Sequence, residues 1–267
     1  MNSQQVSIVI PTFNRAAFLM ECIDSCLNQT VSCEIIVCDH GSTDHTPEAV
    51  KKYGNKIKYI RRELDSGVHF CWLDGVLHAT NDLVHINFDD DWIEPTFIEE
   101  SLKLFTNEVG CVFTDAKIYF EGENRFEGSG FTFQNKTGIF NSSELAKFNY
   151  RSLTSPCAGT FRKKILIDNL FVGQIPFSAS SYHGVGPDVL FSLMSTIDYP
   201  KYGYVHQQLA IFRAHENSIT IDAMNDKAKH LKIKKAYNDA RKFYFLTKLI
   251  NKLLKYQLFR KYIINQK

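Results

Sequence analysis

The chain has 267 residues, of which 44% are hydrophobic and 22% charged, and this is enough apolar material for one large domain with a buried core. No stretch approaches the roughly 18 consecutive apolar residues that a membrane-spanning helix needs, so we expect no such helix. The seven cysteines lie mostly within apolar runs, which predicts reduced thiols in a cytosolic protein.

Charge is distributed unevenly along the chain. Residues 227–267 contain thirteen Lys and Arg residues against a single acid, Asp239, which gives this segment a net charge of +12. Because the whole chain carries +2, the preceding 226 residues carry −10. An acidic body followed by a basic segment indicates a two-part molecule, and it disfavours nucleic acid as a partner.

Strand and helix patterns alternate over about the first 115 residues. Strands are predicted at 6–10, 34–38, 57–60, 83–88 and 109–114, with helices between them at 18–27, 46–53, 70–79 and 96–105. This order is typical of an α/β fold with a Rossmann-like, mostly parallel sheet that carries helices on both faces.

The pattern changes after Thr114. We predict, in order, an antiparallel excursion, two short helices, a flexible polar loop on the substrate side, a helix and a strand, at 117–140, 142–148, 163–169, 177–186, 189–196 and 204–212. From residue 223 onward the chain is basic and compatible with helix, and we predict two tail helices that are separated near Thr247.

Three consecutive carboxylates, Asp89–Asp91, follow the predicted strand at 83–88. Such carboxylates repel one another unless a cation lies among them, and their oxygens suit Mg²⁺ or Mn²⁺ bridging a diphosphate. The alternative is an acidic loop that caps a helix. Pro11, Thr12 and Asp39 also fall at carboxyl ends of predicted strands, where ligands of parallel sheets bind. This convergence favours a binding site.

Five segments, taken in order, resemble motifs of the family 2 glycosyltransferases with a GT-A fold, of the bacterial polysaccharide and O-antigen type. They are an opening strand with its loop, an Asp-x-Gly-Ser-Thr-Asp turn, a DXD-like acidic region, a Gly-x-Asp step and an Arg-x-His segment, at 6–15, 39–44, 88–92, 186–188 and 212–219. The resemblance covers roughly residues 5–220, which makes it more specific than any single motif.

The chain departs from the family pattern at several positions. His40 and Pro187 stand where the family usually has Asp and Glu, and Trp72 stands where a basic residue is expected near the diphosphate. If the acidic region is aligned on Trp92, Phe88 replaces its first Asp; aligned on the three carboxylates, the DXD motif is intact.

The resemblance implies a site for a nucleotide sugar and a metal ion. The residues implied to bind the nucleotide sugar are Pro11, Thr12, Asn14, Asp39, Asp65, Gly67, Asp89, Asp90 and Arg213. Asp91 and His215 are implied to bind Mn²⁺ or Mg²⁺, with Asp91 as the first choice. The alternatives are that Asp39 caps a turn and that His215 is structural.

The implied activity is that of an inverting, metal-dependent hexosyltransferase that prefers a UDP-linked sugar. Asp188 would take the proton of the acceptor hydroxyl as its oxygen attacks the anomeric carbon, while the cation and Arg213 stabilise the departing nucleoside diphosphate. The acceptor is expected to be a glycan, in particular a lipid-linked saccharide in surface polysaccharide synthesis. The alternative role of Asp188 is a helix N-cap.

The resemblance also implies a division of the chain. Residues 1–115 would form the nucleotide-sugar-binding half and residues 116–222 the acceptor-binding half of one GT-A domain, followed by a basic amphipathic helical tail at 223–267.

Three other classes of protein compete with this interpretation. A sugar-1-phosphate nucleotidyltransferase would need a Gly-rich basic loop after its first strand, but Pro11–Arg15 has no Gly. An aspartate-nucleophile phosphatase would place its acids after the first strand rather than the fourth. A catalytically disabled glycan- or membrane-binding relative stays open, because the departures could have disabled the site.

The tail interleaves apolar side chains with Lys and Arg from Phe243 onward. Basic helices with an apolar face lie in the headgroup layer of anionic membranes, so we predict a membrane surface as a partner. The expected location is cytoplasmic, peripherally attached to the inner face of the plasma membrane. The alternative is that the tail packs on the catalytic domain or on a second subunit in a homo-oligomer.

Overall fold

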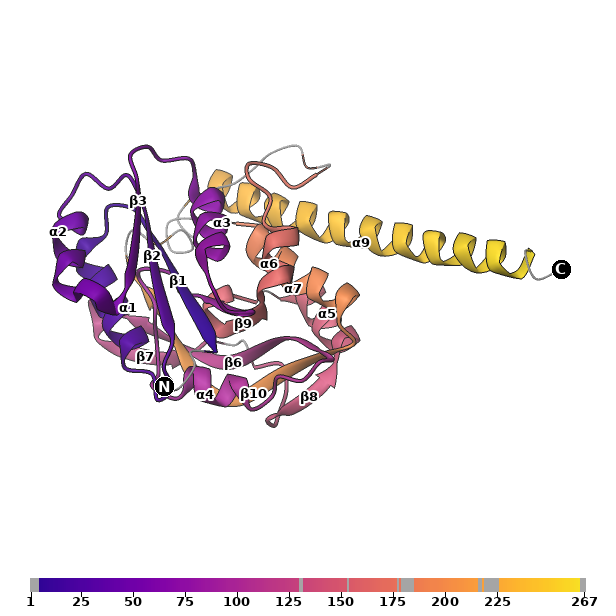
Figure 1. Cartoon of the computed structure of the whole chain (residues 1–267), viewed down its shortest axis with the longest axis horizontal. Helices are drawn as coiled ribbons and strands as arrows, with labels where there is room; N and C mark the ends of the chain where they lie inside the picture. The colour runs from indigo at the N-terminus through magenta and orange to yellow at the C-terminus, as the bar shows by residue number, and fades with distance from the viewer. Residues whose placement is uncertain are drawn as a thin grey trace.

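A computed structural model describes residues 5–129, 132–152, 154–176, 178, 185–215, 218 and 226–264. These residues form a ten-stranded sheet that carries helices on both faces, and a long helix extends away from it (Figure 1). The prediction of an α/β fold with a mostly parallel sheet is confirmed.

The central path of the sheet has the order β3-β2-β1-β4-β9-β6-β10-β5, with β7 and β8 paired to β6 and β10. The strands are β1 (Val6–Thr12), β2 (Glu34–His40), β3 (Lys58–Arg62), β4 (Leu83–Ile86), β5 (Trp92–Ile93), β6 (Val109–Phe120), β7 (Arg125–Gly128), β8 (Gly138–Asn141), β9 (Gly159–Arg162) and β10 (Lys201–Ala214). Every residue of β1 is buried, as expected of a central strand that is covered on both faces.

Parallel pairing dominates the part of the sheet that carries the candidate site. β1 pairs in parallel with β2 and β4, β2 pairs in parallel with β3, and β6 pairs in parallel with β10. β9 lies antiparallel between β4 and β6, so β6 and β10 keep the direction of β1. The carboxyl ends of these strands therefore meet at one edge of the sheet.

The sheet separates two apolar cores, one on each of its faces, and helices cover both. The helices are α1 (Ala16–Leu27), α2 (Thr46–Val50), α3 (Val68–His78), α4 (Phe97–Leu102), α5 (Ser142–Arg151), α6 (Lys163–Asn169), α7 (Pro187–Asp198) and α9 (Lys227–Ile264). Leu19 of α1 and Phe97 of α4 belong to one core. Trp72 of α3, Leu166 of α6 and Phe191 of α7 belong to the other.

The predicted antiparallel excursion at 117–140 begins where it was expected. From Lys117 to Phe120, β6 pairs antiparallel with β7 while it stays parallel to β10 on its other side, and β8 pairs antiparallel with β10. The predicted polar loop at 177–186 falls largely outside the described residues.

The expectation of two tail helices is wrong, because α9 is a single helix from Lys227 to Ile264. The segment contains no Gly or Pro that would break it, and the hydroxyl of Thr247 donates to the carbonyl of Phe243 one turn earlier, within the helix. Ala240 and Tyr244 are buried in a cluster with residues of α7, and Ala236 is buried as well.

The second half of α9 extends beyond the body of the molecule (Figure 1). Leu249, Ile250, Leu253 and Leu254 are each 44–53% exposed there. Among the described residues no helix is long and apolar enough to cross a membrane.

Candidate active site at the carboxyl ends of the strands

The predicted site residues converge because their strands are parallel. Thr12 at the end of β1 is directly beside Asp39 in β2, and the acidic triplet follows β4, the other neighbour of β1. His215 follows β10, which ends at the same edge. Residues near the start of the chain, such as Thr12, and residues after its last strand, such as His215, therefore lie at the same edge of the sheet.

Polar contacts join the loop after β1 to the turn after β2. Asn14, at φ 55°, accepts hydrogen bonds from the backbone N–H groups of Thr43 and Asp44 at 2.7 and 3.3 Å. In return, the Asp44 carboxylate accepts from the N–H of Ala16 at 3.2 Å. These contacts hold the loop at 6–15 against the turn at 39–44, which are two of the segments that resemble family motifs.

Gly41 is required in this turn. Its φ is +82°, and a Cβ added to it would lie 2.9 Å from the carbonyl oxygen of Glu63. A side chain would therefore be strained by both the backbone angle and the contact.

Asp39 is fully buried at the end of β2. One carboxylate oxygen accepts from the N–H of Ser42 at 2.8 Å, and the other accepts from the Tyr59 hydroxyl, with the Nε of Arg61 3.5 Å away. These contacts fit the turn-capping role, and the contact of Asp39 with a nucleotide base stays a prediction.

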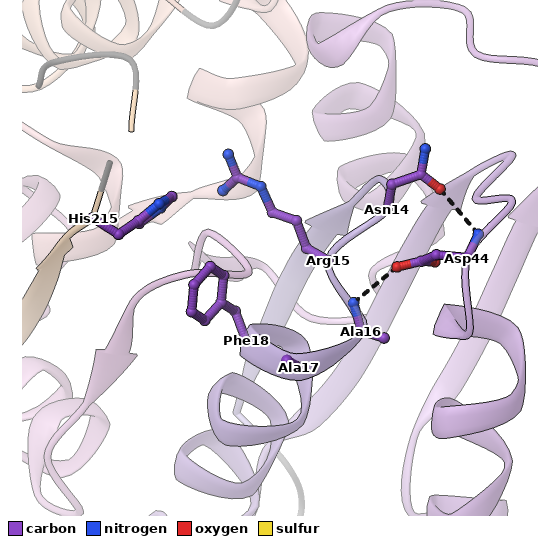
Figure 2. A pocket seen from close by; sticks show the side chains of 7 residues that line it. All are labelled: Asn14, Arg15, Ala16, Ala17, Phe18, Asp44 and His215. Carbon is purple, nitrogen blue, oxygen red and sulfur yellow. Dashed lines mark hydrogen bonds between the residues drawn. The ribbon is translucent and has the colours of Figure 1, made fainter. Parts of the chain in front are cut away.

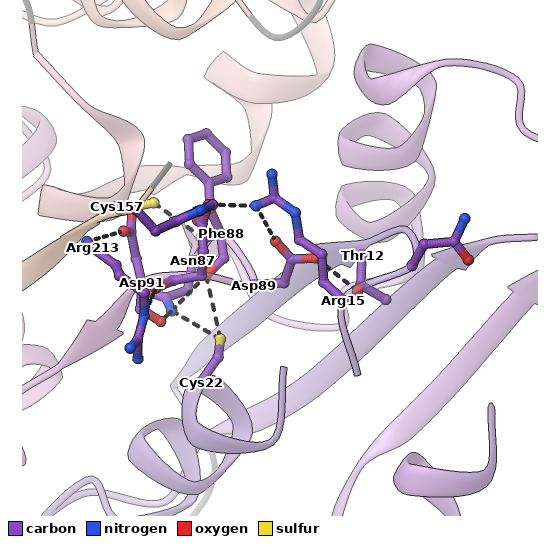
Figure 3. A network of polar contacts seen from close by, with 12 residues as sticks. Thr12, Arg15, Cys22, Asn87, Phe88, Asp89, Asp91, Cys157 and Arg213 are labelled. Atoms are coloured by element: carbon purple, nitrogen blue, oxygen red, sulfur yellow. Dashed lines mark hydrogen bonds and ion pairs between the residues drawn. The ribbon is translucent and has the colours of Figure 1, made fainter. Parts of the chain in front are cut away.

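Arg15, in the loop after β1, contacts both Asp89 and Asp90, and Figure 3 shows its contact with Asp89. Its Nη1 contacts Asp89 at 3.2 Å and Asp90 at a shorter distance. Asp89 also accepts from the hydroxyl of Thr12 at 2.7 Å. Asp89 and Asp90, which the resemblance assigned to the nucleotide sugar, are thus held by an arginine.

The environments of the three carboxylates push their pKa values apart. Burial, with the neighbouring Asp90 charge, raises the pKa of Asp89 to about 7, although Arg15 opposes the shift. Burial also acts upward on the pKa of Asp90, but the hydrogen bond to His215 and the charge of Arg15 outweigh it and lower that pKa. Asp90 is therefore the carboxylate most firmly held in its charged form.

Asp91 points away from this group. Its Oδ1 accepts from the backbone N–H of Arg213 at 2.9 Å, and the thiol of Cys157 bonds to it as well. Burial and the charge of Asp90 raise its pKa well above the ordinary value. The buried contacts of Asp91 join β10 to the acidic loop.

The guanidinium of Arg213 is engaged within the protein. It pairs with Glu21 and, at 3.0 Å, with Glu121, and it lies 4.7 Å from the ring centre of Trp92. Its side chain is 6% exposed, whereas that of Arg15 is 30% exposed. The contact of Arg213 with a diphosphate stays a prediction, and Arg15 is the more accessible cation.

A pocket of about 500 Å³ opens beside these groups (Figure 2). Its lining is Asn14, Arg15, Ala16, Ala17, Phe18, Asp44 and His215. Within it, Nε2 of His215 lies 3.2 Å from Oδ2 of Asp90, and the His215 ring packs on Phe18 at 4.9 Å. A partly apolar pocket that presents an arginine and a histidine suits an anion attached to an organic group.

A divalent cation fits only part of this arrangement. No group of three or more potential ligands occurs among the described residues. However, Mg²⁺ and Mn²⁺ in nucleotide-binding sites are typically held by one or two carboxylates together with phosphate oxygens. Asp90 and His215 are a suitable protein pair for this purpose, whereas the contacts of Asp91 leave it less suited.

Asp65 and Gly67 lie in the loop that precedes α3. Asp65 accepts from the N–H of Gly67 at 2.8 Å, and its carboxylate lies 3.7 Å from Nδ1 of His40. Gly67 begins the helix at φ +93°. The loop therefore reaches the end of β2, and donor contacts by Asp65 and Gly67 stay predictions.

Asp188 lies at the first turn of α7, beside the C-terminal helix. Its Oδ1 accepts from the N–H groups of Gly186 and Val189, both at 2.8 Å, and its Oδ2 accepts from the Tyr237 hydroxyl at 3.2 Å. Burial raises its pKa to about 6, although these three donors oppose the shift. A carboxylate with this pKa can act as a base near neutral pH.

The sequence prediction assigned no role to Arg15, Glu21 or Tyr237. Arg15 carried a signal, because it follows Asn14 inside a segment that resembles a family motif. The roles of Glu21 and Tyr237 depend on contacts between distant elements, so spacing alone could not find them.

The chain is similar to known proteins in sequence and in fold. A chondroitin synthase of Pasteurella multocida (strain Pm70) is 37% identical over 114 residues, which cover 41% of this chain and 12% of the synthase. The structure of S. aureus TarS 1-349 in complex with UDP-GlcNAc has a TM-score of 0.62 at 20% identity, covering 80% of this chain and 60% of that chain.

A mannosyltransferase from Pyrobaculum calidifontis, PcManGT in complex with GDP-Man and Mn²⁺, has a TM-score of 0.56 at 16% identity. The match covers 91% of this chain and 73% of that chain. At these identities both structures establish the fold alone. The model of the family described as Glycosyl transferase family 2 matches residues 7–168, which is more than half of the chain. The chain therefore belongs to glycosyl transferase family 2.

Proposed function

We propose that this protein is an inverting glycosyltransferase that moves a sugar from a nucleotide sugar to a hydroxyl of a glycan acceptor. The observation that carries the proposal is the pocket in which Arg15 faces Asp89 and Asp90 at the carboxyl ends of parallel strands, in a chain of this family. A UDP-linked donor is favoured because the related TarS structure contains UDP-GlcNAc, while the GDP-Man complex supplies the second candidate.

Arg15 is the group best placed to meet the charge of the diphosphate. It lines the pocket and contacts the Asp90 carboxylate, so it can exchange one anionic partner for another. Stabilisation of the charge that develops on the leaving group is a large part of catalysis in such reactions. Arg213 supports the same loop through the carbonyl oxygen of Asp90 at 3.0 Å.

Asp188 is the proposed general base. It removes the proton from the acceptor hydroxyl while the acceptor oxygen bonds to the anomeric carbon and the bond to the diphosphate breaks. A direct displacement of this kind inverts the anomeric configuration. A positioned base contributes on the order of 10²–10⁴-fold to the rate.

Asp90 and His215 would hold a Mn²⁺ or Mg²⁺ ion together with the diphosphate oxygens. A bound ion would supply positive charge beside the leaving nucleoside diphosphate. The metal role of Asp91 remains the weaker alternative, because its carboxylate serves the backbone of Arg213.

The test is release of nucleoside diphosphate from a panel of UDP-sugars and GDP-mannose, with Mn²⁺, with Mg²⁺ and with excess chelator. We expect release from at least one donor, and less of it with chelator. A sugar-1-phosphate nucleotidyltransferase would instead form pyrophosphate from a nucleoside triphosphate and a sugar 1-phosphate. Absence of release from every donor, with or without acceptor, would contradict the proposal.

We further propose that the second half of α9 docks on an anionic membrane surface, where the acceptor is a lipid-linked saccharide. Leu246, Leu249, Ile250 and Leu253 recur at helical spacing on one side of α9 and are 39–53% exposed. The lysines 248, 252 and 255 follow the same periodicity on the other side, and no acid follows Asp239. An apolar face opposite a basic face is the arrangement of helices that lie in the headgroup layer.

A further inference from the structure

We propose that Tyr237 is a positioning residue for Asp188, so that the first half of α9 completes the active site rather than only supporting it. This inference rests on the proposed function, in which Asp188 is the base. It assigns a role to a residue outside the segment 7–168 that the family model matches.

The two oxygens of the Asp188 carboxylate have different environments. Oδ1 accepts two backbone hydrogen bonds, from Gly186 and Val189, and these are the contacts of an ordinary helix start. Oδ2 accepts from the Tyr237 hydroxyl at 3.2 Å. A carboxylate oxygen has two lone pairs, so Oδ2 can accept from Tyr237 and from an acceptor hydroxyl at the same time. Tyr237 thus orients the oxygen that would take the proton.

Tyr237 is itself fixed by its helix. One residue earlier, the carbonyl oxygen of Ala236 lies 3.3 Å from the position of a Cβ on Gly186, which has φ +107°. One turn later, Arg241 donates to the carbonyl oxygens of Asn149 and Ser152 at 2.9 and 3.2 Å. α9 is therefore held against Gly186 on one side of Tyr237 and against the end of α5 on the other.

The described titratable groups that face Asp188 are Tyr237 and Arg241, both in α9. The Tyr237 hydroxyl donates to the ionised carboxylate, which stabilises the form of Asp188 that can accept a proton. Tyr237 keeps its own proton throughout, because the acceptor proton passes to Asp188 as the nucleoside diphosphate leaves with the bonding electron pair. Removal of the hydroxyl should therefore raise the pKa of Asp188 and loosen its orientation.

The chain offers a matched control. Tyr244 lies on the same helix, is buried against α7, and its hydroxyl lies 3.1 Å from Oγ1 of Thr196. Tyr237→Phe and Tyr244→Phe each remove one hydroxyl that joins α9 to α7, but only the first removes a contact with Asp188. Both full-length variants would be assayed for release of nucleoside diphosphate from the best donor of the panel, with water as acceptor, between pH 5 and pH 8.

We expect Tyr237→Phe to move the acidic limb of the profile upward by about one pH unit, the effect of losing a hydrogen bond to a charged group, with an unchanged KM for the donor. With the limb moved from about 6 to about 7, kcat at pH 6.5 should fall about threefold. Tyr244→Phe should keep the wild-type limb. The pKa of Asp188, followed by the ¹³C shift of its carboxyl carbon and assigned with Asp188→Asn, should show the same difference without any turnover.

Two results separate failure of this inference from failure of the proposed function. If Tyr237→Phe and Tyr244→Phe have the same pH profile and the same Asp188 pKa, Tyr237 does not position the base. If Asp188→Asn itself keeps the wild-type turnover, Asp188 is not the base, and the proposed mechanism falls with the inference.

Discussion

Nε2 of His215 lies 3.2 Å from Oδ2 of Asp90, although 125 residues separate them in the chain. The contact exists because β10 runs parallel to β6 and ends at the same edge of the sheet as β4. It connects the acidic loop to the last strand, so the pocket is complete only when the whole sheet has formed.

Arg15→Ala should weaken UDP binding at least tenfold. The variant removes the accessible cation of the pocket, and a hydrogen bond to a charged group contributes about 1.5–3 kcal/mol. It should also lower the free energy of unfolding by about 1–3 kcal/mol, because Asp89 and Asp90 lose a partner while buried. Titration calorimetry with UDP and thermal unfolding would measure the two effects.

Arg125→Ala is the control for this substitution. Its guanidinium pairs with Glu123 and Glu127 on the surface, so its removal should change neither UDP affinity nor stability appreciably. If Arg15→Ala binds UDP as tightly as Arg125→Ala does, Arg15 has no part in the donor site.

Asp90→Asn and Asp91→Asn should separate the metal role from the structural role. Asp90 contacts His215 in the pocket, so we expect Asp90→Asn to lose the gain in UDP affinity that Mn²⁺ gives. Asp91→Asn keeps an oxygen that can accept from the N–H of Arg213, so it should keep that gain. The reverse outcome, with the gain lost only in Asp91→Asn, would place the ion at Asp91.

Gly41→Ala should destabilise the protein more than Gly54→Ala. Both glycines have a positive φ, which costs a residue other than Gly about 1 kcal/mol or more. Only Gly41 also meets a carbonyl oxygen, at 2.9 Å, whereas nothing lies within 4 Å of a Cβ at Gly54. Equal shifts of Tm in the two variants would mean that the turn after β2 moves to admit a side chain.

The sequence predicted the strands of the parallel half and the edge where the site lies, because buried parallel strands are long apolar runs with polar residues at their ends. It did not predict β9, a strand of four residues whose partners, β4 and β6, are set by contacts between distant segments. The contacts of Arg213 could not be predicted either, because its guanidinium pairs with Glu21, which is 192 residues away in the chain.

The tail shows a different limit. Helical character and charge were evident in the sequence, but the number of helices was not, because Thr247 is a weak helix former that hydrogen bonding retains within α9. The sequence also did not predict that the two halves of α9 have different environments. Ala240 and Tyr244 pack on the body, while residues from Phe245 onward include exposed apolar side chains.

Full-length protein should cosediment with vesicles that contain anionic lipid, and replacement of Lys248, Lys252 and Lys255 by Glu should abolish this. Each basic residue near an anionic leaflet contributes about 1 kcal/mol, and salt screens the effect. The informative truncation ends after Lys248, since a cut at Asp226 would also remove the buried Ala236, Ala240 and Tyr244.

If the protein shortened after Lys248 pellets as well as the full-length chain, or if neither binds at low salt, the membrane proposal is wrong. Light scattering would then show whether the exposed face of α9 instead joins two copies of the chain.

The most direct test of the central claim compares Asp188→Asn with the wild type for UDP binding and for release of nucleoside diphosphate across pH. Asp188 acts as a base only when it is deprotonated, and its pKa is raised to about 6, so wild-type kcat should fall as the pH drops through about 6. Asp188→Asn should bind UDP normally and lose at least about 100-fold in kcat. Its remaining kcat should not fall as the pH drops through about 6. Wild-type turnover in Asp188→Asn, or loss of UDP affinity with an unchanged kcat, would contradict the account.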